Sequence, residues 1–114
     1  MTYKEKTAHI RSELRVLHKL NPETAKGFNA LSMGAMADGS LDKKTREFLA
    51  LAIAVTQRCE PCITLHVEAL MKAGASRDEV GSCLAMCVHM GGGPALMYVG
   101  EAVKAWEAMV PAAG

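Results

Sequence analysis

The fold is decided by the stretch Asp42–Gln57, DKKTREFLALAIAVTQ, which begins with charged and polar residues and continues into an apolar run. Asp42 can cap a helix, and the following FLALAIAV is apolar on every side of a helix. A helix of this kind is buried. Glu47 lies at its polar end, where a carboxylate one turn inside a buried helix must either face solvent or find a partner.

A second helix is predicted directly after this one, beginning within the sequence CEPCITLH at residues 59–66. Pro61 is favoured in the first turn of a helix, where proline loses no helical hydrogen bond, and Gly74 can end the helix. Cys62 then lies in the first turn, and His66 lies one turn beyond it on the same face.

The other helices are predicted from caps and apolar spacing. They are an amphipathic helix over about Lys4–Leu20, a helix opened by Asn21-Pro22, a helix that follows the capping box Ser76–Glu79, and a helix opened by Pro94. No strand pattern is found in the sequence. We therefore expect residues 1–114 to form a single all-α domain of about six short helices.

Charge and composition limit the functional classes. The formal charge is +1, with thirteen Lys and Arg scattered among twelve Asp and Glu, which disfavours nucleic acid and anionic membranes as partners. The first residues lack the apolar core of a secretory signal, so we expect a cytoplasmic protein. The 21 uncharged residues between Glu79 and Glu101 could span a bilayer, but Gly91–Pro94 interrupts them, which indicates two buried half-length helices instead.

The amount of apolar sequence exceeds what so short a chain can bury. A domain of this size hides only about two-thirds of the area of its extended chain, and large exposed apolar patches usually mark interfaces. The sequence therefore predicts a homo-oligomer.

The two cysteines of CEPC have the spacing of a redox centre. A thiol reacts as the thiolate, and a free cysteine is only a few per cent ionised at neutral pH. The N–H groups at the helix start and the imidazole of His66 can both favour the thiolate of Cys62. Cys59 is close enough in sequence to close a disulfide with Cys62, so the pair predicts a recyclable two-electron centre.

Together, Glu47, the CEPC sequence and His66, followed by AGAS and MGGGPA, resemble the carboxymuconolactone decarboxylase superfamily, and within it the alkylhydroperoxidase D-like branch. The resemblance covers about Leu41 to Trp106. It implies a small all-helical protein that forms trimers or hexamers. It also implies a thiol-dependent peroxidase or disulfide oxidoreductase that needs neither a cofactor nor a metal.

The resemblance assigns a role to each residue of the motif. Cys62 attacks the hydroperoxide or disulfide substrate, Cys59 resolves the product, and Glu47 with His66 relays protons. A dithiol restores the cysteines, and because family members are recycled by dihydrolipoyl groups, a lipoyl-bearing protein is the expected reductant. Pro61 stands where the best-known peroxidase of the branch has a second histidine; thiol–disulfide exchange does not need that histidine.

Two alternatives to thiol chemistry stay open. Cys59 and Cys62 could form half of a zinc site in a binding or assembly module, completed by Cys83 and Cys87 or by His66 and His89, although the spacing does not match a zinc ribbon. Cys83 and Cys87 fall within a helix among apolar residues, which favours buried small hydrophobes. The chain could also be a lactone decarboxylase or related isomerase, whose activity would survive blocking of the thiols.

Overall fold

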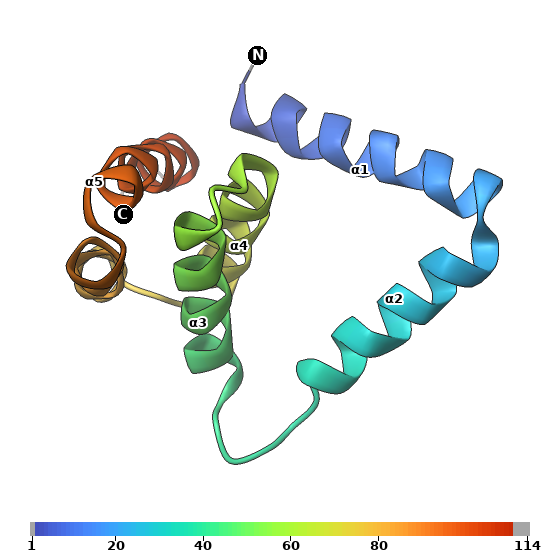
Figure 1. Cartoon of the computed structure of the whole chain (residues 1–114), viewed down its shortest axis with the longest axis horizontal. Coiled ribbons are helices and arrows are strands. Elements are labelled where there is room, and N and C mark those ends of the chain that lie inside the picture. Colours follow the sequence, from blue (N-terminus) through green and yellow to red (C-terminus); the bar gives the residue numbers. More distant parts are fainter. Residues whose placement is uncertain (1, 111–114) are drawn as a thin grey trace.

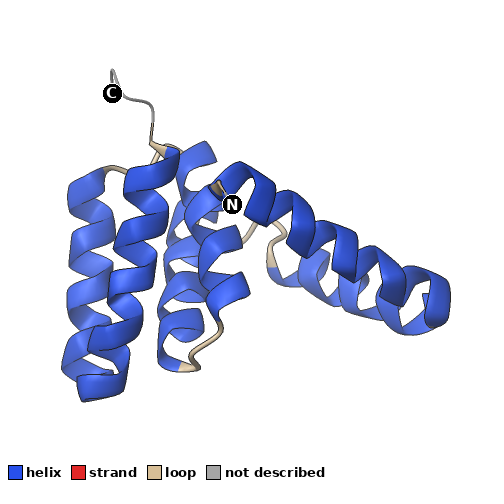
Figure 2. Cartoon of the chain, turned by 90° about the horizontal axis from the view of Figure 1, so that it is seen from above, coloured by secondary structure: helices blue, strands red, loops and turns tan. Residues whose placement is uncertain are grey.

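The computed structural model of the chain describes residues 2–110, whose regular elements are all α-helices (Figure 2). They are α1 (Tyr3–Leu20), α2 (Pro22–Ala35), α3 (Lys43–Thr56), α4 (Glu60–Lys72) and α5 (Arg77–Met109). The predicted all-α fold is therefore confirmed, while the predicted homo-oligomer stays a prediction.

The last two predicted helices form one element, α5, which is broken in the middle. Gly92 has non-helical backbone angles, with φ 68° and ψ −152°, and Pro94 follows it. The two halves lie side by side (Figures 1 and 2), and an ion pair of 2.6 Å joins Arg77 to Glu107 near their ends. By length and composition alone α5 could cross a membrane, but the break at Gly92 folds it back on itself.

The core lies between α3, α4 and the two halves of α5. Its fully buried members include Leu51 and Val55 of α3 and Ile63, Val67 and Leu70 of α4. The prediction that α3 is buried on every side is wrong for one face, where Leu49 and Ile53 are 50% and 55% exposed. Among the helices of residues 2–110, α4 and α5 are the ones that pack against α3, so its third side stays open.

The first half of α1 is attached to this core, and the rest of the α1–α2 segment projects away from it (Figure 1). Thr7 and Ile10 are buried, and Arg11 donates a hydrogen bond of 2.5 Å to Glu68 of α4. Beyond this point α1 is exposed. Among the described helices α2 packs against α1, and at its last residue Ala35 O accepts a hydrogen bond of 3.4 Å from Arg46 of α3. We refer to residues 11–35 as the α1–α2 arm.

The turn between α3 and α4 positions the first residue of the CEPC sequence. Arg58 has a left-handed backbone with φ 60°, and this conformation lets the Cys59 N–H donate a hydrogen bond of 3.0 Å to Ala54 O. The Arg58 N–H donates to Val55 O at 3.2 Å, which completes the helix-ending motif. Cys59 is therefore held by the end of α3 as well as by the start of α4.

We predict that Arg58→Gly raises the free energy of unfolding by about 0.5–1 kcal/mol, because glycine adopts the left-handed conformation without the penalty of a side chain. Denaturant unfolding at a fixed protein concentration measures the change. Arg58→Ala is the matched control, since it removes the same exposed side chain but keeps the penalty. A stability gain as large in Arg58→Ala as in Arg58→Gly would contradict the backbone explanation.

Candidate active site

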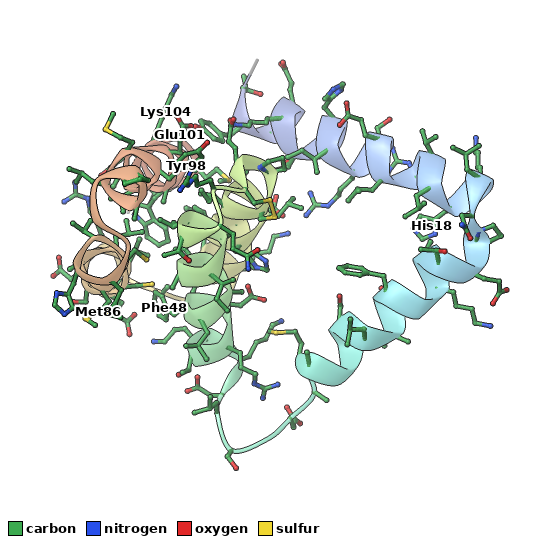
Figure 3. All side chains as sticks on the ribbon, viewed as in Figure 1. His18, Phe48, Met86, Tyr98, Glu101 and Lys104 are labelled. Carbon is green, nitrogen blue, oxygen red and sulfur yellow. A yellow bond between two sulfur atoms is a disulfide. The ribbon has the colours of Figure 1, made fainter. Side chains whose placement is uncertain are left out.

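The start of α4 is built by the two cysteines and the proline between them. Cys59 is the N-cap residue, and its Sγ accepts a hydrogen bond of 3.2 Å from the Cys62 N–H. Pro61 lies in the first turn, so the predicted position of this helix start is confirmed. Cys59 and Cys62 form a disulfide with their Cα atoms 5.2 Å apart, drawn as the yellow bond in Figure 3.

Glu47 of α3 and His66 of α4 form a hydrogen bond of 2.8 Å between Oε2 and Nδ1. Glu47 is only 6% exposed, so of the two expectations for this carboxylate, solvent or a partner, the structure shows the partner. The side chain of His66 is 36% exposed. When Nδ1–H donates to the carboxylate, Nε2 keeps its lone pair and can exchange a proton.

These contacts bring the four predicted site residues to one place, where α4 begins beside α3. Cys62 precedes His66 by one helical turn on the same face of α4, and Glu47 reaches this face from α3. The arrangement joins a cysteine pair to a titratable base whose ring orientation is fixed by a buried carboxylate. It can therefore pass two electrons through the sulfur atoms and one proton through the imidazole.

A charged pair that the sequence did not reveal lies at the same helix start. Lys6 of α1 forms an ion pair with Glu60, the residue after Cys59, and approaches the ring of Tyr3 at 5.0 Å. Burial acts to lower the pKa of Lys6, but the hydrogen bond and charge of Glu60 outweigh it, and the pKa lies above its ordinary value. Lys6 thus balances the negative charge of Glu60 next to the sulfur atoms. Fifty-four residues separate the pair, and no local pattern connects them.

Cys83 and Cys87 lie on α5, and both thiols are directed to backbone oxygens. The Cys83 thiol donates to Phe48 O at 3.4 Å, and the buried Cys87 thiol donates to Cys83 O at 3.4 Å. Burial raises the pKa of Cys83 to about 11 and also raises the pKa of Cys87. Both residues therefore hold the neutral thiol at physiological pH.

The zinc alternative would need these thiols, or His66 and His89, to converge on Cys59 and Cys62. Residues 2–110 contain no group of three or more His, Cys, Asp or Glu side chains arranged to hold a metal ion. His66 is directed to Glu47 instead, and His89 is exposed on α5.

The sequence and the structure of this chain are both similar to those of one known protein family. Residues 22–105 match the Carboxymuconolactone decarboxylase family. A solved structure of a carboxymuconolactone decarboxylase family protein from Legionella pneumophila is 44% identical, with a TM-score of 0.88 over 92% of this chain and 94% of that one.

Two further relatives are more distant. A family protein from Thermotoga maritima, whose description connects it with an antioxidative response, is 28% identical, with a TM-score of 0.81 over 90% of this chain and 87% of that one. An uncharacterised protein of Cupriavidus necator is 29% identical over 106 residues, which are 93% of this chain and 94% of the relative.

We predict two classes of thiol in this protein. In the oxidised chain, Cys83 and Cys87 should react very slowly with an alkylating reagent at pH 7, and rapidly only after unfolding, because burial keeps them protonated. Mild reduction should then release two additional thiols, at Cys59 and Cys62, that react fast in the folded protein. Peptide mass mapping identifies which thiols react, and fast labelling of Cys83 or Cys87 in the folded chain would contradict this division.

Proposed function

The chain belongs to the carboxymuconolactone decarboxylase family, and from this premise we propose that it is a thiol oxidoreductase that reduces hydroperoxides or disulfides through Cys59 and Cys62. The observation that carries the proposal is the hydrogen bond between the buried Glu47 and His66, one turn from Cys62. A base fixed in this way next to a disulfide-forming cysteine suits thiol activation. The antioxidative description of the Thermotoga maritima relative supports the same chemistry.

The first step uses Cys62 as the nucleophile and His66 as the base. His66 Nε2 accepts the thiol proton, and the thiolate attacks the terminal oxygen of the hydroperoxide. The O–O bond breaks, an S–O bond forms as sulfenic acid on Cys62, and the departing alkoxide takes the proton from His66 to leave as the alcohol. Glu47 holds the ring and stabilises the imidazolium that forms between the two proton transfers.

The second step returns both sulfur atoms to the disulfide. The Cys59 sulfur attacks the Cys62 sulfur, the S–O bond breaks, and the hydroxide leaves with the Cys59 proton as water. An external dithiol then reduces the disulfide and is itself oxidised by two electrons. We propose a dihydrolipoyl group on a partner protein as this dithiol, in the reducing environment of the cytoplasm.

A disulfide substrate would enter the same site without a hydroperoxide. Dithiol Cys59 and Cys62 would reduce it through a mixed disulfide with Cys62, which Cys59 then resolves. Because Pro61 has no titratable group, we assign the proton exchange with Cys62 in both reactions to His66. Disulfide exchange needs less proton transfer than hydroperoxide reduction, because it forms no alkoxide that must be protonated.

We expect Cys62→Ser to abolish reduction of an organic hydroperoxide in the presence of dihydrolipoamide, because serine cannot supply the thiolate. Cys83→Ser is the matched control and should retain turnover, since its thiol points to Phe48 O rather than to the site. Peroxide consumption and thiol loss are measured together. Full turnover in Cys62→Ser would refute the proposal, and turnover of a carboxylated lactone by a chain with all its thiols blocked would favour the decarboxylase alternative.

We expect His66→Gln to lower kcat/KM for the hydroperoxide by roughly 10²-fold or more, the usual contribution of a general acid–base group. Glu47→Gln should lower it less, by roughly tenfold, because the imidazole remains but loses its fixed orientation. Glu68→Gln serves as the control, since this half-buried carboxylate of α4 pairs with Arg11 and not with a site residue. Equal rates in all three variants would show that the Glu47–His66 pair does not activate Cys62.

A further inference from the structure

The ion pair between Lys6 and Glu60 joins the first helix of the chain to the segment between the two cysteines. The first turns of α1 lie against α4 and α5 (Figure 1), and from there Lys6 contacts Glu60. Glu60 follows Cys59 directly and precedes Cys62 by two residues, so its carboxylate is the negative charge nearest in sequence to both sulfur atoms. A group that neutralises Glu60 therefore changes the electrostatic environment of the whole cysteine pair.

Lys6 is a fixed positive charge, held by groups on three helices. Its ammonium lies 5.0 Å from the centre of the Tyr3 ring on α1, and its side chain is 25% exposed. Burial acts to lower the pKa of Lys6, but the hydrogen bond and charge of Glu60, with smaller contributions from Tyr3 and from Glu101 of α5, raise it above its ordinary value. Lys6 therefore stays protonated throughout the pH range in which thiols titrate.

The charge of this pair acts on one redox state only. A disulfide is uncharged, whereas the reduced pair contains a thiolate, which a nearby positive charge favours and a nearby negative charge disfavours. The contribution of so exposed an ion pair to the stability of the fold is small. Its effect on the balance between disulfide and dithiol can therefore be measured apart from its effect on folding.

We propose that Lys6 is a positioning residue for the cysteine pair: by neutralising Glu60 it stabilises the thiolate of reduced Cys62 and shifts the equilibrium from the disulfide toward the dithiol. In this equilibrium a dithiol such as dihydrolipoamide gives two electrons and two protons to the Cys59–Cys62 disulfide. The S–S bond of the chain breaks, that of lipoamide forms, and the Cys62 thiol then releases a proton to solvent. The inference rests on the proposed function only in treating this disulfide as the redox centre.

The other charged groups around the cysteines stay in place when the ion pair is changed. Arg58, the residue before Cys59, is exposed at the end of α3. Glu47 and His66 bind each other at 2.8 Å on the side of α4 that faces α3. Substitutions in the ion pair alter none of these groups, so a change in the redox equilibrium reports on the ion pair itself.

The test measures the equilibrium of the chain with reduced and oxidised lipoamide in Lys6→Met, Glu60→Gln and the double variant. Lys6→Met leaves Glu60 unbalanced and should shift the equilibrium toward the disulfide by roughly three- to tenfold at pH 8; tenfold is about 30 mV for a two-electron couple. Glu60→Gln should shift it by a similar factor toward the dithiol, and the double variant should return close to the wild type. Alkylation followed by intact mass counts the free thiols.

The opposite signs distinguish this role from a structural one, because either single substitution breaks the same ion pair. Shifts in the same direction, a shift in only one single variant, or no shift in either would overturn the proposal. The shifts should also be smaller at pH 6, where less thiolate forms, and in 1 M salt, where the Debye length is about 3 Å. Shifts that are unchanged under both conditions would contradict an electrostatic origin.

Two control variants keep the test specific to position 6. Lys6→Arg preserves the charge and should retain the equilibrium of the wild type. Lys4→Met removes the same charge from an exposed residue two positions earlier on α1, which does not face the same direction, and should leave the equilibrium unchanged. Because lipoamide is the only reactant, the result is independent of hydroperoxide turnover: failure of the proposed function would appear as turnover in Cys62→Ser, and failure of this inference as a wrong sign here.

Discussion

The site depends on one interaction, the hydrogen bond that the buried carboxylate of Glu47 makes with His66. A carboxylate that is 6% exposed is costly to bury unless it is hydrogen-bonded, so the pair fixes α3 and α4 at one relative position. The same bond sets the orientation of the imidazole one turn after Cys62. A single contact thus satisfies the buried carboxylate and orients the imidazole.

The backbone around the cysteines also helps to place the site. The left-handed Arg58 ends α3, and Cys59 begins α4 as its N-cap, so the disulfide is held between two helix termini. Lys6 then forms an ion pair with Glu60, the residue after Cys59. The cysteine pair is therefore placed by backbone geometry and by the first half of α1. Under the proposed function, His66 governs its proton exchange.

The sequence predicted local features of this structure well. The start of α4 at Pro61, its end at Gly74 and the capping box at Ser76 follow from rules that act within a few residues, and the structure confirms them. Such rules do not predict contacts between segments that are distant in the sequence. The partner of Glu47 was implied only by family resemblance, and the pair Lys6–Glu60 was not indicated at all. The half-exposure of Leu49 and Ile53 also departed from the expectation, because burial depends on how many helices one chain has available to cover α3.

Under the proposed function, the Glu47–His66 pair and the start of α4 keep Cys62 ionised in the reduced protein. The most direct measurement is the rate of Cys62 alkylation as a function of pH, followed by peptide mass mapping in the reduced chain. We expect a large fraction of Cys62 to be thiolate already at pH 7. A thiolate fraction of only a few per cent, as in a free cysteine, would contradict it.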